Sequence, residues 1–294
     1  MLSKVDRGVL FMLVSALISA LNGAIAKILS DDISALEIVF FRNLLGVLFL
    51  LMMLKHTPTR LPGGQPHLLV LRGLLGFSAM ILFFYTITTI PLGVAITLNK
   101  TSPLFVSVLA FFLLKEHLSK KGVIALLIGF IGVLLIAKPV GLTFSYEHLL
   151  GVLGGFLAAA AYTTIKKIKH IYDARVIVLS FMTTGAVIPL LLFLITPYID
   201  APEAVSFLFV EFHMPSSYKI WSLILAMGII STISQWLLTK AYSLSRAGII
   251  GVVSYTNIPF AIGFGTMLGD AFPDFWTFCG IGLIVLGGLL VKKG

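Results

Sequence analysis

Long apolar segments dominate this chain and restrict the class of structure it can adopt. Runs of about 20 hydrophobic residues alternate with short polar joints, and a helix of that length crosses about 30 Å of hydrocarbon. Backbone N–H and C=O groups find no water inside a bilayer, so each run must satisfy them internally as a helix. Hydrophobic residues make up 59% of the sequence and charged residues only 11%, too little charge for the surface of a soluble domain. The sequence therefore predicts an all-α integral membrane protein.

Ten transmembrane helices are expected, and most of the joints between them are short. The predicted spans are 8–29, 33–54, 68–89, 92–114, 120–138, 148–168, 175–197, 219–244, 247–269 and 274–291. The joint 198–218 is longer and contains an apolar stretch, 204–210. This stretch is too short to span and is expected to lie in the membrane interface.

The basic residues predict how the chain is oriented in the membrane. Most of the 21 Lys and Arg residues fall in alternate joints on one side, and Arg72 is assigned to that group. Only Lys27, Lys138 and Lys219 fall on the other side. This bias places both termini in the cytoplasm of a multi-pass protein of the cell membrane, expected to be a bacterial inner membrane. It also accounts for the formal net charge of +9 without nucleic-acid binding.

An internal repeat divides the chain into two halves. The segment Asn99–Pro103 in the fourth span is similar to Tyr255–Pro259 in the ninth, and a glycine-rich span follows each. The predicted repeats are residues 1–140 and 147–294, with five helices each. An odd number of helices forces the second copy to enter the membrane from the opposite face, so the repeats are inverted, as in many secondary transporters.

Five short motifs carry a resemblance to a known family. They are Phe41-Arg42-Asn43, Ile90-Pro91-Leu92-Gly93, Pro103-Leu104-Phe105, Leu114-Lys115-Glu116-His117-Leu118 and Gly129-Phe130-Ile131-Gly132-Val133. The sequence resembles the ten-helix EamA-type members of the drug/metabolite transporter superfamily over essentially its whole length. The second half is a weaker copy, with Gly269-Asp270 where the family usually has Gly-Glu. The resemblance implies two inverted five-helix bundles around a central cavity that works by alternating access. It leaves the substrate open among amino acids, sugars, vitamins, nucleotide derivatives and drugs.

Two cations and one acid lie within the predicted spans. Arg42 and Lys100 are placed near mid-membrane, where a cation costs about 3 kcal/mol even on the lower scale, and Glu37 lies near the outer end of its span. Two cations against one carboxylate leave a positive charge that would attract an anionic substrate group. Alternatively, Arg42 binds backbone carbonyls of kinked helices and Lys100 pairs with Glu37. Both interpretations stand for Arg42, and the functional one is favoured for Lys100.

Paired prolines mark a second candidate feature. Pro103 and Pro259 interrupt the fourth and ninth spans at matching positions, and each removes a helical hydrogen bond. Polar side chains, among them Asn99, Tyr255 and Asn257, precede the two prolines. Paired interruptions of this kind indicate a binding site, although kinks that only shape the packing would give the same pattern.

Further polar and aromatic side chains complete the predicted substrate site. Asn22 and Gln235 lie on polar faces of the first and eighth spans, with Trp236 beside Gln235. Tyr85 and Tyr162 are candidate aromatic walls, together with Trp236. The alternatives are interhelical hydrogen bonds for the amides and an interfacial position for Tyr85.

Absent motifs narrow the function further. The sequence has no phosphate-binding loop for ATP, and its six histidines fall in joints or at helix ends, so neither a metal nor another cofactor is expected. We expect a secondary transporter, not an enzyme, for a small anionic or zwitterionic metabolite such as an amino acid or derivative. The alternatives within transport are drug export and uptake of a vitamin or S-adenosylmethionine-like solute. The alternatives of another class are a passive channel and an intramembrane enzyme. The expected partners are the bilayer, the substrate and a proton or counter-substrate, and the expected assembly is a monomer or homodimer.

Overall fold

The computed structural model describes residues 4–30, 32–59, 63–89, 98–116, 119–137, 146–199, 201–268 and 273–292. Throughout these ranges the regular structure is helical. The helices are α1 (Lys4–Leu29), α2 (Ala35–His56), α3 (Pro66–Thr89), α5 (Ser102–Leu114), α6 (Lys120–Ala137), α7 (Tyr146–Ile168), α8 (Ala174–Ile195), α9 (Tyr218–Leu244), α10 (Ala247–Ser254), α11 (Asn257–Met267) and α12 (Phe275–Lys292).

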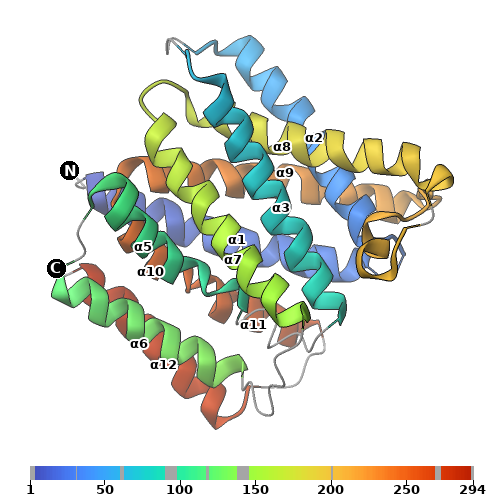
Figure 1. Ribbon diagram of the computed structural model, residues 1–294. Coiled ribbons are helices and arrows are strands. Elements are labelled where there is room, and N and C mark those ends of the chain that lie inside the picture. The colour runs from blue at the N-terminus through green and yellow to red at the C-terminus, as the bar shows by residue number, and fades with distance from the viewer. Residues whose placement is uncertain are drawn as a thin grey trace.

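The described helices confirm the predicted fold class. Seven segments are long and apolar enough to cross a membrane, and one of them joins α10 and α11 into a single broken span. The shorter helices α5, α6 and α12 correspond to the remaining predicted spans. The beginning of the predicted span 92–114 lies outside the described residues. The two ends of the chain lie on the same side of the bundle (Figure 1).

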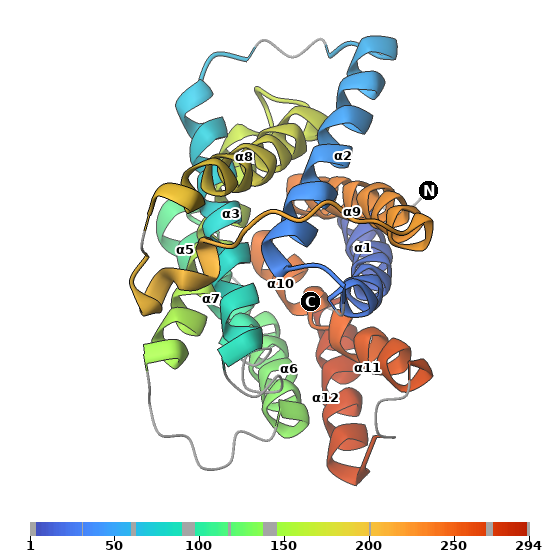
Figure 2. The same ribbon diagram turned by 90° about the vertical axis from the view of Figure 1, so that its right-hand side faces the viewer.

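Packing between the helices follows the proposed internal symmetry. We match the five spans of the first half in order to the five of the second, so that α1 corresponds to α7, α2 to α8, α3 to α9, α5 to α10 and α6 to α12. Under this matching, each of the most extensively packed helix pairs corresponds to another such pair or to itself. The pair α1–α9 corresponds to α3–α7, and α2–α9 corresponds to α3–α8. The pairs α2–α8, α5–α10 and α6–α12 each correspond to themselves. The α6–α12 pair forms one edge of the molecule, away from α2 and α8 (Figures 1 and 2). The repeat boundaries 1–140 and 147–294 stay a prediction.

Glycine allows α6 and α12 to approach closely. A Cβ built on Gly132 would lie 2.6 Å from the carbonyl oxygen of Gly280, and a Cβ on Gly280 would lie 2.6 Å from that of Gly132. Both distances are too short for any side chain, because the opposing atom belongs to a backbone that cannot move aside. Small residues at such contacts are a common means of packing helices in lipid. Gly282 has no neighbour within 4 Å and serves no such contact.

We expect Gly280→Val to separate α6 from α12 and to destabilise the protein by about 1–3 kcal/mol, the usual cost of overpacking. The measurement is the midpoint of thermal unfolding of the purified protein in detergent. Gly282→Val makes the same change on the same helix at an open position, so it is the control. Equal midpoints for the two variants would contradict the close contact.

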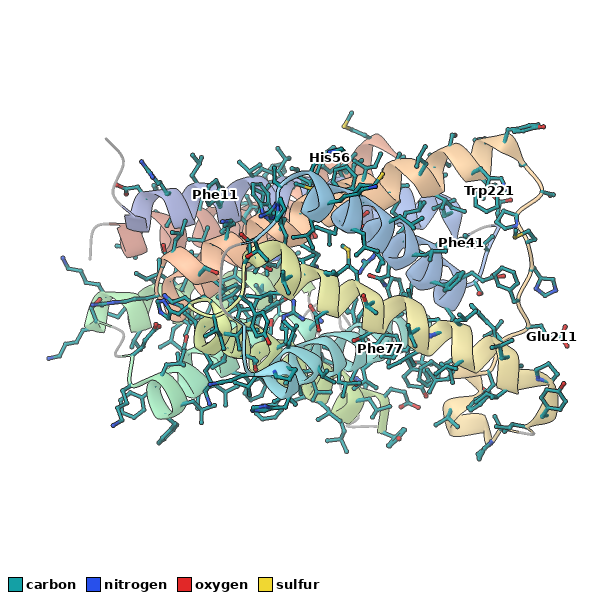
Figure 3. All side chains as sticks on the ribbon, turned by 90° about the horizontal axis from the view of Figure 1, so that it is seen from above. Phe11, Phe41, His56, Phe77, Glu211 and Trp221 are labelled. Atoms are coloured by element: carbon teal, nitrogen blue, oxygen red, sulfur yellow. The ribbon has the colours of Figure 1, made fainter. Side chains whose placement is uncertain are left out.

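Aromatic side chains cover the end of the bundle near the 196–217 connection. This connection forms two 3₁₀ turns, η1 (Thr196–Tyr198) and η2 (Glu203–Leu208). The ring centres of Phe41 and Trp221 lie 5.3 Å apart, and those of Tyr85 and Phe207 lie 4.2 Å apart with the rings tilted by 36°. Phe41, Trp221 and Glu211 lie toward one end of the molecule and Phe11 toward the other (Figure 3). The stretch 204–210, expected at the membrane interface, thus packs partly against the protein itself.

Polar contacts join two connections at the opposite end of α2 and α8. Asp173 caps α8 by accepting from the Arg175 amide at 2.8 Å, and it also accepts from Arg175 Nε at 3.0 Å. Arg175 in turn donates to the Thr57 carbonyl oxygen at 2.8 Å. Burial alone would raise the pKa of Asp173, but the hydrogen bonds and charge of Arg175 outweigh it and hold the pKa below its ordinary value.

Candidate functional site

A small cavity lies among α2, α3, α7, α8, α9 and the turn before α5. Its volume is about 160 Å³, and it is lined by Arg42, Arg72, Gly76, Ala79, Met80, Phe83, Asn99, Ala161, Tyr162, Phe181 and Gln235. Phe77, the neighbour of Gly76 in α3, lies near the middle of the bundle (Figure 3). The structure therefore brings together four of the predicted site residues, Arg42, Asn99, Tyr162 and Gln235, from four different parts of the chain.

Arg72 is a cavity residue that the sequence analysis missed. The predicted span 68–89 contains it, but it was counted with the basic residues of the preceding joint. In the structure α3 begins at Pro66 and places Arg72 nearly two turns inside the helix. Its side chain is only 1% exposed, and its guanidinium carbon lies 4.8 Å from the centre of the Phe181 ring. Gly73 and Gly76 follow it on α3. An arginine followed by two glycines near the start of an apolar run was the signal that could have identified it.

Several buried polar atoms of the bundle have no hydrogen-bond partner among the described residues, and four of these atoms belong to the cavity residues Arg42, Arg72 and Gln235. The atoms without a partner are Asn22 Oδ1, Arg42 Nε, Asn43 Oδ1, Arg72 Nε and Nη1, Gln235 Oε1, Trp236 Nε1, Thr239 Oγ1 and Tyr255 OH. The one hydrogen bond recorded for Arg42 is from Nη2 to the sulfur of Met80, at 3.0 Å. Buried polar groups are normally paired, because each lost hydrogen bond costs about 1–3 kcal/mol. A concentration of unpartnered donors and acceptors is therefore characteristic of a site that receives a ligand or water.

No carboxylate offsets the two arginines within the cavity wall. Among the described residues that line it, none is Asp or Glu. Glu37, the one acid predicted within a span, lies instead at the first turn of α2, where it accepts from the Ser34 amide at 2.7 Å and the Ser34 hydroxyl at 2.6 Å. Its second oxygen accepts from the His213 amide at 2.6 Å. Glu37 thus caps α2 and holds the connection before α9, and it does not pair with Lys100.

The two helix breaks, one in each predicted repeat, contact each other. In the first, the Thr101 amide donates to the Leu98 carbonyl three residues back, and Pro103 follows in the first turn of α5. In the second, α10 ends at Ser254 and α11 begins at Asn257, two residues before Pro259. Lys100 Nζ donates to Asn257 Oδ1 at 3.3 Å. The amide nitrogen of Asn257 then donates to the Ala16 carbonyl of α1 at 3.0 Å.

The remaining predicted site residues lie outside the cavity wall. The Tyr255 ring is fully buried and packs against Gly129, where a Cβ would lie 2.7 Å from a ring carbon. Trp236 lies on α9 next to Gln235, with Lys240 5.9 Å from its ring centre. Tyr85 lies with Phe207 in the aromatic cluster described above. Asn22 lies on α1, and its unpartnered oxygen is its only feature in common with the cavity residues.

Comparison with known proteins assigns the family. Residues 6–138 match the profile of the EamA-like transporter family. Over 97% of its length, the chain is 35% identical to an uncharacterised transporter of Helicobacter pylori, and the match covers 94% of that protein. The chain belongs to the EamA-like transporter family. It is therefore a multi-pass membrane transporter of the drug/metabolite superfamily, and small molecules are its substrates.

Two characterised relatives and a solved structure extend the comparison. This EamA-like transporter is 28% identical to the pseudopaline exporter of Pseudomonas aeruginosa, with 99% of this chain and 98% of the exporter covered. It is 25% identical to the S-adenosylmethionine uptake transporter of Rickettsia prowazekii, with 97% and 92% covered. A solved crystal structure with 17% sequence identity superposes with a TM-score of 0.76, covering 97% of this chain and 98% of the other. That likeness concerns the fold.

We expect Asn257→Ala to destabilise the transporter by about 1–3 kcal/mol, because the partly buried Lys100 ammonium loses its acceptor and the Ala16 carbonyl loses a donor. Asn257→Asp is the matched variant, since it keeps an acceptor for Lys100 and adds a countercharge. In detergent, the midpoint of thermal unfolding should be higher for Asn257→Asp than for Asn257→Ala. The reverse order would show that the Lys100–Asn257 contact does not hold the two breaks together.

Proposed function

We propose that this transporter carries a small organic solute with at least one anionic group, and that the solute binds in the cavity between Arg42 and Arg72. The observation that carries the proposal is the pair of arginines in a cavity wall whose described residues include no carboxylate. A cation held in the membrane interior is costly and is normally paired. A carboxylate or phosphate on the solute would supply the missing partner, because a guanidinium binds either group through two parallel hydrogen bonds.

The neutral polar groups of the cavity suit the rest of a zwitterionic solute. Gln235 Oε1 is buried without a donor among the described residues, and Asn99 offers a second amide beside it in the cavity wall. These oxygens could accept hydrogen bonds from an ammonium group, while Tyr162 and Phe83 provide flat apolar walls. An amino acid or a derivative of one combines these features, and it is the substrate class we favour.

The size of the cavity favours a small metabolite. Sites for drug-sized ligands have volumes of about 300–1,000 Å³, whereas this one measures about 160 Å³. Export of bulky drugs is therefore less well supported in this conformation. The relatives include one named for export and one named for uptake, and gradients rather than the fold decide the direction of a carrier.

Alternating access is the mechanism we propose, and a polar lock at one end of the cavity supports it. Glu116, at the end of α5, pairs with Lys166 of α7 at 3.0 Å. Its other oxygen accepts from the amide of Ala247, the first residue of α10, at 2.9 Å. The lock joins the first half of the chain to two helices of the second half, and on the predicted topology it closes the cytoplasmic end. A proton or a counter-substrate would drive the cycle.

We expect Glu116→Gln to weaken this lock and to increase opening at that end. The measurement is the rate at which a thiol reagent labels Ala247→Cys, which replaces a fully buried side chain, in a Cys279→Ser background. Labelling should be several-fold faster with Glu116→Gln than without it. Lys121→Gln, a change of an exposed residue at the start of α6, is the control. Equal rates in all three proteins would exclude a gating role for Glu116.

The proposed substrate class can be tested by ligand stabilisation. A bound ligand raises the unfolding midpoint by mass action, so purified transporter is screened against amino acids, carboxylates, phosphate esters and neutral analogues. We expect the stabilising compounds to be anionic or zwitterionic, and their effect to be lost in Arg42→Gln. Saturable uptake into proteoliposomes, accelerated by unlabelled compound on the far side, then confirms transport. Stabilisation by neutral compounds alone would refute the proposal.

A further inference from the structure

We infer that the cavity takes a solute with two separate carboxylate groups, one bound by Arg42 and the other by Arg72. This inference rests on the proposed function and narrows its substrate class. It assigns Arg72 as a residue that determines specificity. Family membership does not require this assignment, and the sequence analysis counted Arg72 only among the basic residues that orient the chain.

The balance of charge in the cavity is the first ground. Arg42 belongs to α2 and Arg72 to α3, so each guanidinium approaches the cavity from its own helix. Among the described residues of the cavity wall there is no acid. A solute with a single carboxylate would neutralise one guanidinium and leave the other unpaired in the membrane interior. Two carboxylates neutralise both.

Unused hydrogen-bond donors are the second ground. Arg42 has a buried Nε without a partner, and Arg72 has both Nε and Nη1 without one among the described residues. Each guanidinium therefore has its own donors to offer, and neither is occupied by a protein carboxylate. Among the described residues, the Arg42 guanidinium makes one hydrogen bond, from Nη2 to the weakly accepting sulfur of Met80 at 3.0 Å. A carboxylate oxygen would be a stronger acceptor than this sulfur.

Arg72 is held in position by its surroundings. Its guanidinium packs against the Phe181 ring at 4.8 Å, which supports the positive charge from one face without using an N–H group. A Cβ on Gly76 would lie 2.3 Å from Arg72 Nη1 and 2.7 Å from a Phe181 ring carbon. Glycine at position 76 therefore makes room for the guanidinium to lie along α3 and face the cavity.

Apolar side chains of α3 in the cavity wall suit a carbon chain. Ala79, Met80 and Phe83 line the cavity with apolar surface, which matches the methylene groups that separate two carboxylates. A phosphate monoester also carries two charges, but on a single group. Its charged end offers no methylene groups to this apolar surface, so the dicarboxylate is the better match.

Matched ligand pairs test this directly on purified wild-type transporter. Succinate is compared with succinamate, and glutamate with glutamine, because each pair differs by the replacement of one carboxylate with an amide of similar size. Methyl phosphate is the third arm. We expect the dicarboxylates to bind about ten- to a hundredfold more tightly than their amides, the effect of a charge-assisted hydrogen bond, and methyl phosphate to bind more weakly than succinate.

Variants then assign the preference to Arg72. In Arg72→Gln, the affinity for succinate should fall to that for succinamate, while the affinity for succinamate itself changes little. Gly76→Ala keeps the positive charge of Arg72 but displaces its guanidinium. This variant should also reduce the preference for succinate over succinamate. Lys121→Gln removes one positive charge at an exposed position and should retain the full preference.

The outcomes separate this inference from the proposed function. If succinamate and glutamine bind as tightly as their partners, the two-carboxylate site is refuted while the single-anion site stands. If methyl phosphate binds more tightly than succinate, the dicarboxylate is refuted in favour of a phosphate ester. If Arg72→Gln weakens acid and amide equally, Arg72 does not select for the second carboxylate. If no anionic compound binds or is transported, the proposed function itself fails.

Discussion

The cost of holding positive charge inside an apolar helical bundle is the constraint on which the proposed site depends. Arg42 and Arg72 line one cavity whose described wall contains no acid, and both retain buried N–H groups without partners. By contrast, the buried Lys166 has its Glu116 partner at 3.0 Å, and the buried carboxylate of Glu37 is fully used in capping α2 and holding His213. The transporter thus pairs Lys166 and Glu37 with neighbouring groups, whereas the two arginines of the cavity keep N–H groups without partners among the described residues.

The surrounding structure positions these charges through contacts between the two halves of the chain. The cavity lies between helices of both halves, α2 and α3 from the first and α7, α8 and α9 from the second, and the two helix breaks meet through Lys100 and Asn257. At the edge of the molecule, α6 and α12 pack backbone to backbone through Gly132 and Gly280. On the proposed mechanism, a tilt of one half against the other would expose the site to either side, and the Glu116–Lys166 lock is a contact between the halves that such a movement would open.

The fold followed from the sequence more completely than the site did. Apolar runs of membrane-spanning length leave only helices as a solution, so the helices of the structure correspond to the predicted spans. The motifs around Pro103 and Pro259 predict the repeat, which the exchange of helix pairs supports. Arg42, Asn99 and Gln235 were predicted because large polar side chains within spans are costly unless they face protein or water, and Tyr162 was predicted as an aromatic wall. Their convergence could not be read from the sequence, because it depends on how five helices pack.

Arg72 and Glu37 show why the other assignments needed the structure. The predicted span 68–89 already contains Arg72, but the count of basic residues by side grouped it with the preceding joint, and its burial against Phe181 shows that it faces the protein interior. Glu37 was one candidate partner for a membrane cation, yet the capping geometry with Ser34 satisfies its carboxylate locally. In both cases the neighbours that the fold brings to the side chain decide the role of the charge.

The most direct test of the central claim is a crystal structure of the transporter grown in bromide, with the anion located by its anomalous scattering. A cavity that binds anions through unpaired arginines should contain bromide in contact with the guanidinium groups of Arg42 and Arg72. Bromide found only on the outer surface, with both guanidinium groups turned onto protein carboxylates or carbonyls, would contradict it.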